Sequence, residues 1–521
     1  MRMQIFSFSP FGYEGALVTV EVDIRRGIPA VDIVGLADGA VKESRERMRA
    51  AVQNSGFEFP PERVLVSLSP ADMRKEGAGF DLAIALAVLQ ARSGKDSFSD
   101  SPAVLVMGEL ELSGNVRGVR AVHAAASTAA ASGIFKCIVP LANADEAREV
   151  HGMKVYGAAS LEDAFSALAS DEVFTERSLS NQSAFVPEHC VETDGVLFPP
   201  VTEGFEFANV AGQIFFVRGL QIAAAGGHNL IAIGAPGCGK TMALQKFQTL
   251  LPLLTVEEAQ PVTRIYSIAG LMRGNEPLVR IAPFRQPHQT ATIEGMCGGG
   301  MRCIPGEISL AHNGVLFLDE AAEFRSSVLQ MLRVPIESGR ITLARAGRST
   351  VYPASFQLLM AANPCPCGNF GSKSKLCLCS ARAVETYWNK FSAPLLDRID
   401  MRIFVDNEGI SHDAARTTTA ELRTEIARAV KTQRKRQGKK NAKLLPEEIA
   451  RCCPMSADGR KSLDNAAMRY GFSPRAVSSS IKVARTIADM ADCPVIQEAH
   501  VKEAVQYRKA CMGFLPENVD G

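Results

Sequence analysis

Residues 230–241 read Leu-Ile-Ala-Ile-Gly-Ala-Pro-Gly-Cys-Gly-Lys-Thr, a short apolar run that breaks into a glycine-rich turn ending in lysine and threonine. This spacing matches the phosphate-binding P-loop pattern in full. The apolar run predicts a buried strand. A helix should follow the turn, because apolar residues recur at helical spacing after it: Ala243, Phe247, Leu250 and Leu251. A strand, a glycine-rich turn and a helix in this order are the context that the motif needs.

The residue types in the turn suit the chemistry of phosphate binding. Glycines let backbone N–H groups close around phosphate oxygens at the start of a helix, the lysine can reach the outer phosphates, and the threonine can ligate Mg²⁺. An ordinary glycine-rich turn is the alternative. We predict a site for ATP and Mg²⁺ to which the turn contributes Gly234, Ala235, Pro236, Gly237, Cys238, Gly239, Lys240 and Thr241.

Two further apolar runs predict strands that end in residues able to serve the same nucleotide. Residues 315–318 precede Asp319, which can hold Mg²⁺, and Glu320, which can orient and deprotonate the attacking water. Residues 356–362 precede Asn363, whose amide can position water without adding charge. Paired with an upstream P-loop, this arrangement predicts nucleotide hydrolysis, whereas alone a strand ending in Asp-Glu would more often be a strand cap.

The composition is that of an ordinary globular protein with several domains. The 521 residues are 46% hydrophobic and 22% charged, and the length suggests about three domains. A net charge of +1 gives no overall attraction to nucleic acid, so any DNA contact must come from local basic patches. We see neither a signal-peptide pattern nor an apolar stretch of membrane-spanning length, so we expect a cytoplasmic protein with no membrane partner.

Changes in pattern along the chain predict three folded regions and a linker. Residues 1–170 alternate between strand and helix patterns, as an α/β domain does. Residues 171–204 lose this periodicity and are rich in Ser, Glu, Asn and Pro, which is typical of a linker. Residues 205–407 hold the P-loop and the strands after it. Residues 408–521 predict an all-α bundle, with helices over residues 420–433, 461–470, 475–490 and 498–509.

Four of the thirteen cysteines form a cluster. Cys365 and Cys367 make one pair, Cys377 and Cys379 make another, and a loop rich in Gly, Ser and Lys separates them. In a reducing compartment, clustered cysteines indicate a metal more than disulfides, and four thiolates can hold tetrahedral Zn²⁺. One residue inside each pair is a tighter spacing than the commonest zinc pattern, so free thiols are the alternative.

Part of the first region resembles the proteolytic domain of Lon-type proteases, over residues 75–82, 108–110 and 114–116. In such a protease, the position of Gly79 would hold the serine nucleophile, and the position at about His123 would hold the lysine. Neither a hydroxyl nor an amine stands at these positions, so covalent catalysis has no nucleophile. We predict a non-proteolytic scaffold or interaction domain in which His123 is a surface or core residue.

The chain over nearly its whole length resembles the YifB/ComM group of magnesium-chelatase-like AAA+ ATPases. The resemblance is carried by residues 224–241, 305–320, 363–368 and 395–400, together with the Lon-like first domain. It implies a ring-shaped, hexameric ATPase with a helical lid, and ComM-type members are similar to helicases that drive branch migration during natural transformation. The expected partners are single-stranded or branched DNA, recombination proteins and further copies of the chain.

The resemblance also assigns two arginines. Arg398 would reach the nucleotide of a neighbouring subunit, although it could instead pair with Asp397 or Asp400. Arg475, in the first turn of a predicted helix, would sense the γ-phosphate of its own subunit, and a solvated helix-end arginine is the alternative. The sequence departs from the family at Gln289, where a histidine is usual, so a role that needs both imidazoles is in doubt.

Two basic segments are candidates for DNA contact. Residues 341–351 predict two short strands around a turn, and in AAA+ helicases that resemble this family a hairpin here lines the central pore. Arg345 and Arg348 would then face phosphates. The densest basic run, residues 434–440, could also touch a phosphate backbone. For both segments the alternative is a solvated surface.

Two rival functions remain beside the DNA motor. A chelatase-type ATPase would use the same nucleotide chemistry to remodel a protein partner. A Lon-like protease is disfavoured because Gly79 stands where the nucleophile would be.

Overall fold

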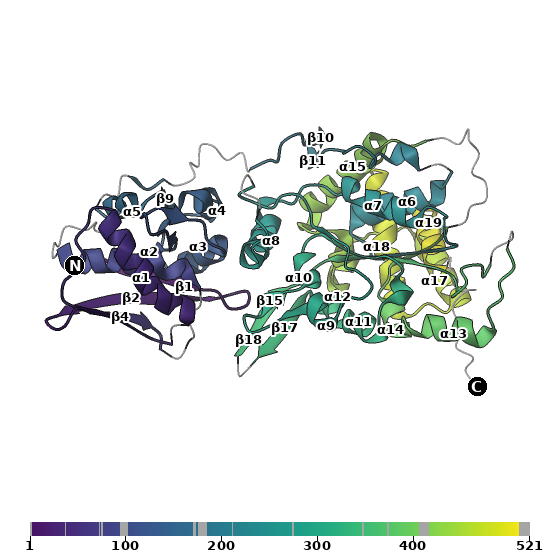
Figure 1. Ribbon diagram of the computed structural model, residues 1–521. Coiled ribbons are helices and arrows are strands. Elements are labelled where there is room, and N and C mark those ends of the chain that lie inside the picture. The colour runs from purple at the N-terminus through teal and green to yellow at the C-terminus, as the bar shows by residue number, and fades with distance from the viewer. Residues whose placement is uncertain are drawn as a thin grey trace.

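The computed structural model describes the chain except residues 1–2, 37, 72, 74, 76, 94–102, 170–172, 176–184, 211, 273–275, 346–347, 372–374, 406–415 and 510–521. Figure 1 shows an N-terminal body beside a larger body that carries a second sheet and the C-terminal helices. Both main sheets contain parallel strands together with covering helices, which confirms the predicted α/β class.

The N-terminal body is built on a seven-stranded sheet in the order β3-β4-β2-β1-β5-β8-β9. Within it, β2 runs antiparallel to both of its neighbours. Buried residues alternate between two cores, so α1, α2 and α5 cover one face of the sheet while α3 and α4 cover the other. The strands are β1 (Gln4–Ser9), β2 (Ala16–Arg25), β3 (Ala30–Val34), β4 (Arg63–Ser69), β5 (Ala103–Val106), β8 (Lys136–Pro140) and β9 (Lys154–Ala158), with a small hairpin of β6 (Glu109–Leu110) and β7 (Val116–Arg117). The helices are α1 (Gly39–Asn54), α2 (Asp81–Ser93), α3 (Val122–Ala131), α4 (Ala144–Arg148) and α5 (Leu161–Ala167).

The stretch predicted as a linker contains ordered structure. β10 (Val191–Thr193) and β11 (Val196–Phe198) pair as an antiparallel hairpin, and the Phe198 side chain is fully buried. The guanidinium carbon of Arg423 lies 5.0 Å from the centroid of that ring. Strands of three residues are too short to show an alternating pattern, so this hairpin left no periodic signal in the sequence.

The second body contains a five-stranded, all-parallel sheet in the order β13-β16-β19-β12-β20. Its strands are β12 (Leu230–Gly234), β13 (Phe284–Arg285), β16 (Val315–Leu318), β19 (Gln357–Ala362) and β20 (Met401–Val405). The core on one face includes α6 (Ile214–Gly226), α7 (Lys240–Lys246) and the C-terminal helices. The other face packs against α11 (Ser326–Met331), α13 (Ala381–Asn389) and α14 (Ala393–Asp397).

The other elements of the second body lie outside this sheet. α8 (Val256–Ala269) lies between the two bodies in Figure 1, and β17 (Arg340–Arg345) pairs with β18 (Arg348–Pro353) in a projecting hairpin. The remaining elements are α9 (Ile293–Cys297), β14 (Gly298–Gly299), β15 (Ile304–Pro305), α10 (Glu307–Leu310) and α12 (Arg333–Ser338).

The C-terminal region is helical, as predicted. The helices are α15 (Thr419–Gln437), α16 (Pro446–Cys452), α17 (Ala457–Tyr470), α18 (Pro474–Met490) and α19 (Glu498–Lys509). The short α16 was not predicted. α15 and α18 pack on α6, so the bundle closes over the P-loop side of the sheet rather than standing apart from it.

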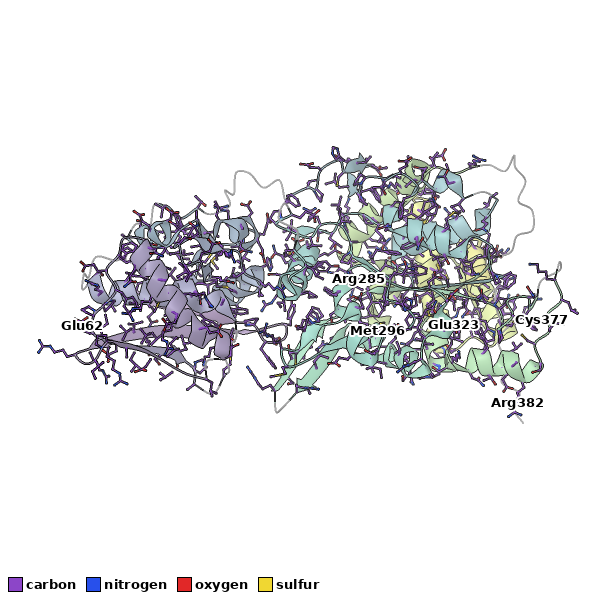
Figure 2. All side chains as sticks on the ribbon, in the orientation of Figure 1. Glu62, Arg285, Met296, Glu323, Cys377 and Arg382 are labelled. Atoms are coloured by element: carbon purple, nitrogen blue, oxygen red, sulfur yellow. The ribbon has the colours of Figure 1, made fainter. Side chains whose placement is uncertain are left out.

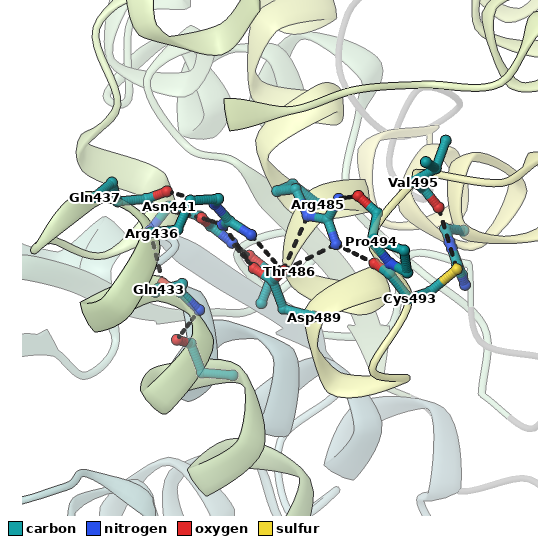
Figure 3. A network of polar contacts seen from close by, with 12 residues as sticks. Gln433, Arg436, Gln437, Asn441, Arg485, Thr486, Asp489, Cys493, Pro494 and Val495 are labelled. Carbon is teal, nitrogen blue, oxygen red and sulfur yellow. Dashed lines mark hydrogen bonds and ion pairs between the residues drawn. The ribbon is translucent and has the colours of Figure 1, made fainter. Parts of the chain in front are cut away.

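The basic run at 434–440 is engaged within the protein (Figure 3). Arg436 makes two contacts with the buried carboxylate of Asp489, at 2.7 and 2.9 Å, and Arg485 donates to the same carboxylate at 3.0 Å. Asn441 donates to it at 2.8 Å, and Lys439 pairs with Glu448 at 2.6 Å. These contacts favour a structural role for the run over a DNA contact.

α3 and α8 join the two bodies. The backbone N–H of Ala121 donates to the carbonyl of Ser267 at 3.1 Å, and the Ser267 hydroxyl donates to the Glu146 carboxylate. His123, predicted as a surface or core residue, is buried here, with its Nε2 at 2.8 Å from Oε1 of Gln260. Gly79 lies in the helical turn Ala78–Phe80, with open space where a side chain would begin.

The β1–β2 turn forms a second junction, against the hairpin of β17 and β18. The backbone N–H of Tyr13 donates to Oγ1 of Thr350 at 2.9 Å, and the guanidinium of Arg348 lies 4.0 Å from the centroid of Phe11. Gly12 has φ +57°, and a Cβ there would lie 2.2 Å from Thr350. The close approach therefore depends on glycine, and it ties the N-terminal body to the predicted DNA-binding hairpin.

Across the described residues, every helix is too short or too polar to traverse a lipid bilayer.

The buried His123 predicts a pH-dependent stability. Burial lowers its pKa from 6.5 to about 4, so the folded protein binds this proton less readily than the unfolded chain. The contribution of neutral His123 to the free energy of unfolding is therefore fully present above pH 6.5 and is lost as the pH drops toward 4. Between pH 7 and pH 5 the loss is about 2 kcal/mol.

Calorimetric unfolding of the protein and of His123→Gln at these two pH values tests this. The variant keeps a polar group opposite Gln260 but cannot titrate, so its loss of stability on acidification should be smaller by that amount. Equal pH dependence in the two proteins would contradict the assignment.

Candidate nucleotide-binding site

The candidate site lies where three parallel strands end together. In the register, Ile233 of β12 aligns with Ala362 of β19, and Leu318 of β16 aligns with Met360. The residues that follow these strands therefore emerge at one edge of the sheet, where ligands of open α/β sheets bind. The P-loop, Asp319 and Asn363 are gathered there although they are far apart in sequence.

Lys240 is held inside the P-loop. Its Nζ donates to the carbonyls of Gly234 at 2.7 Å and Ala235 at 2.9 Å, and lies 3.4 Å from Oδ1 of Asn363. The side chain is buried, so its charge is directed at the loop interior. Gly237 and Gly239 have φ values of +78° and +83°, which suit glycine and turn the loop into α7.

The two predicted magnesium ligands are in contact. Thr241 Oγ1 donates to Oδ1 of Asp319 at 2.9 Å, and the backbone N–H of Glu320 donates to the same oxygen at 3.0 Å. A hydroxyl and a carboxylate oxygen are ligands that Mg²⁺ prefers. They join the P-loop to the end of β16, as the sequence predicts for a shared cation.

Glu320 is exposed and sits in an unusual backbone conformation, with φ 47° and ψ 49°. Strain at a non-glycine residue of this kind is often found where a side chain must be aimed at a ligand. Nε2 of Gln289 donates to Oε2 of Glu320. Gln289, where the family resemblance leads us to expect a histidine, thus touches the predicted catalytic base through an amide, which does not titrate.

Arg398 and Arg475 converge on one carboxylate that the sequence did not single out. Arg398 pairs with Oε2 of Glu337 at 2.7 Å, and Arg475 donates to Oε1 of the same residue. Hydrogen bonds from Arg398 and then Arg475 hold the pKa of Glu337 below its usual value. Glu337 lies on α12 and has no local motif, so only the folded chain could show this pairing.

The alternative partners of Arg398 are otherwise engaged. Asp397 pairs with Arg508 at 3.1 Å, and Asp400 accepts from the Ser479 hydroxyl at 2.6 Å. The two arginines line a cleft of about 940 Å³ whose described lining contains none of residues 234–241. In this arrangement Arg475 is grouped with Arg398 and not with the P-loop.

The four clustered cysteines lie on the segment that follows Asn363. Their sulfur atoms are all within 4.8 Å of one another. A hydrogen bond from the backbone of Asn369, with a further one from Cys365, lowers the pKa of Cys367 to about 6. Figure 2 places Cys377 on a loop that projects from the end of the second body away from the N-terminal body.

Comparisons with known proteins agree with this architecture. Residues 206–412 match the family profile described as magnesium chelatase, subunit ChlI, residues 416–508 match its C-terminal profile, and residues 20–143 match a further profile, subunit ChlI of Mg-chelatase. The fold and the site thus define a magnesium-chelatase-like protein.

Relatives that match over nearly their whole length identify the group within this class. The chain is 38% identical to the uncharacterized protein YifB of Escherichia coli strain K12 over 502 residues, which cover 95% of each chain. It is 37% identical to the competence protein ComM of Haemophilus influenzae over 511 residues, 97% of each chain. It is also 37% identical to the uncharacterized protein Rv2897c of Mycobacterium tuberculosis over 513 residues, 97% of this chain and 98% of the other. The chain belongs to the YifB/ComM group of magnesium-chelatase-like proteins, as its motifs predicted.

The geometry separates two roles that a pair of variants can test. Glu320→Gln keeps the shape of the side chain but removes the base, so ATP should still bind while turnover falls at least about 100-fold. Lys240→Ala removes the charge that faces the phosphates, so ATP binding itself should be lost.

Binding of a fluorescent ATP analogue and release of phosphate would be measured side by side. Wild-type turnover in Glu320→Gln would rule out this residue as the base.

Proposed function

We propose that this protein is an ATP-driven, ring-forming DNA motor of the ComM type that promotes branch migration during uptake or recombination of DNA. The observation that carries the proposal is the joined set at the sheet edge, where Lys240 reaches Asn363 and Thr241 reaches Asp319. These are the parts that an ATPase needs to bind Mg²⁺-ATP and place water beside its γ-phosphate. The competence name of one relative supports the link to DNA.

ATP with Mg²⁺ is the proposed fuel, and each residue at the sheet edge has a role in it. Lys240 and the P-loop backbone neutralise phosphate charge, Thr241 and Asp319 hold the cation, and Glu320 activates water. Asn363 orients that water. Gln289 holds the Glu320 carboxylate in place through its amide.

The two arginines are proposed to act on a neighbouring subunit. Because Arg398 and Arg475 share Glu337 in a cleft apart from the P-loop, they form one cationic pair, which suits delivery to a nucleotide held by the next copy in a ring. Glu337 would hold the pair until a phosphate competes for it. The family resemblance instead implies that Arg475 serves its own subunit, and mixed rings separate the two assignments.

Mixed rings test the assignment. Subunits carrying Arg475→Ala and subunits carrying Lys240→Ala should each be inactive alone. When they are mixed, an intact P-loop can face an intact arginine pair across an interface, so part of the ATPase activity should return. The same recovery is expected with Arg398→Ala.

Assembly of each variant and mixture is checked by light scattering. If Arg475 acted within its own subunit, mixtures with Arg475→Ala would stay inactive while mixtures with Arg398→Ala recovered.

The hairpin of β17 and β18 is the proposed DNA contact. It forms as predicted, and Arg345 and Arg348 are exposed on either side of its tip. Repeated around a ring, two cations per subunit would make a local basic surface, although the net charge of the whole chain is only +1. The stacking of Arg348 on Phe11 means that the N-terminal body could register whether the hairpin is occupied.

Replacing both arginines should weaken DNA binding and leave the nucleotide site intact. Arg345→Ala with Arg348→Ala should weaken binding to forked or three-stranded DNA, reduce the salt slope by about one for each phosphate that is no longer neutralised, and abolish unwinding. ATPase activity without DNA should survive. The matched control is Arg460→Ala with Lys461→Ala, two exposed cations on α17.

Unchanged DNA affinity and salt slope in the assembled hairpin variant would move the binding surface elsewhere. If DNA changed neither ATPase rate nor hydrodynamic behaviour of the wild type, the rival function, a motor that remodels a protein partner, would be favoured.

A further inference from the structure

The loop between β19 and α13 brings four thiol sulfurs into the shape of a metal site. Sγ of Cys365 lies 3.4 Å from that of Cys367 and 3.7 Å from that of Cys377, and the last two are 3.6 Å apart. Cys379 completes the group within 4.8 Å. A tetrahedron of Zn–S bonds about 2.3 Å long has sulfur–sulfur edges of about 3.8 Å, so the spacing fits one Zn²⁺.

Backbone groups around the sulfurs suit thiolates. The N–H of Phe370 donates to Sγ of Cys365 at 3.3 Å. The N–H groups of Asn369 and Leu378 donate to the sulfur of Cys367. Such donors stabilise and orient sulfur ligands, and a metal site needs this supporting layer as well as the ligands themselves. The loop is short, so closing it around a metal costs little conformational entropy.

The same loop is packed against the P-loop. Gly368 has φ +77°, and a Cβ on it would lie 2.4 Å from Cδ and 2.7 Å from Cγ of Pro236. At the start of the loop, Asn363 lies 3.4 Å from Lys240, and the carbonyl of Pro364 accepts from Nε1 of Trp388 at 3.0 Å. The sulfur cluster is thus connected to two parts of the nucleotide site within a few residues.

We propose that Cys365, Cys367, Cys377 and Cys379 bind one structural Zn²⁺ per chain, and that the metal-held loop braces Pro236 and Asn363 in the geometry that binds ATP. The metal replaces the hydrophobic core that a loop of this size lacks. The bracing rests on the proposed role of the P-loop, whereas the metal content does not.

Metal analysis tests the first part. Full-length protein purified without added metal should contain one zinc per chain by elemental analysis, and Co²⁺ exchanged into it should give the absorption of tetrahedral thiolate coordination. Cys377→Ser with Cys379→Ser should lose the metal. The matched control, Cys190→Ser with Cys493→Ser, removes two half-buried cysteines outside the cluster and should retain it.

A folded protein without metal, with all four thiols free to react, would overturn the site. Full zinc occupancy in the Cys377 and Cys379 variant would overturn the ligand assignment.

The Gly368→Ala variant tests the bracing without touching a ligand. It should keep its zinc but bind a fluorescent ATP analogue about tenfold more weakly, because the added methyl group displaces Pro236. Gly438→Ala introduces a side chain at a similar φ of +70° with open space around it and should bind normally. Circular dichroism confirms that each variant is folded.

Zinc removal by a chelator should weaken nucleotide binding by a similar factor. Unchanged affinity in both Gly368→Ala and folded, zinc-stripped protein would overturn the bracing. If the wild type bound zinc but no ATP, the proposed nucleotide role would fail and the metal site would stand.

Discussion

The parallel register of β12 between β19 and β20 is the constraint on which the rest of the second body depends. All five residues of β12 are buried, and the six residues of β19 are as well, so a slip by one position would turn every side chain toward the wrong layer. The fixed register places Gly234 next to Val405 and the P-loop beside Asn363. The position of the candidate site residues at the sheet edge follows from this packing.

A buried polar network carries the same constraint into the helical bundle. Nε2 of His228 lies 2.7 Å from Oγ1 of Thr486 on α18, and Asn229, the next residue, accepts at its side chain from the N–H of Leu358 at 2.8 Å. Its own N–H donates to Asp400 at 3.0 Å. Buried polar groups are costly unless they are paired, so this network ties the start of β12 to two neighbouring strands and to the bundle. The network therefore connects α18, which also carries Arg475, to the start of β12, the strand that leads into the P-loop.

Three local junctions connect separate parts of the molecule. The cysteine loop contacts Pro236, the paired arginines sit on Glu337, and the β1–β2 turn holds the hairpin through Thr350. The hairpin junction also has an apolar part, since Tyr13 packs edge-on against the buried Tyr352. Each junction joins residues that lie far apart in sequence.

The sequence by itself determined the α/β class, the family and the residues that follow the strands. Those signals are local: the P-loop, the run ending at Asp319 and the strand before Asn363 each depend on a few consecutive residues, and the strand and helix periods are just as short in range. β10 and β11 gave no such signal, because strands of three residues are too short to show a period. Only the tertiary structure decided that Arg398 and Arg475 share Glu337, that Gln289 reaches Glu320, and that the cysteine loop contacts the P-loop. Each of these pairings joins residues distant in sequence, and their geometry is set by how the elements pack, which no local pattern encodes.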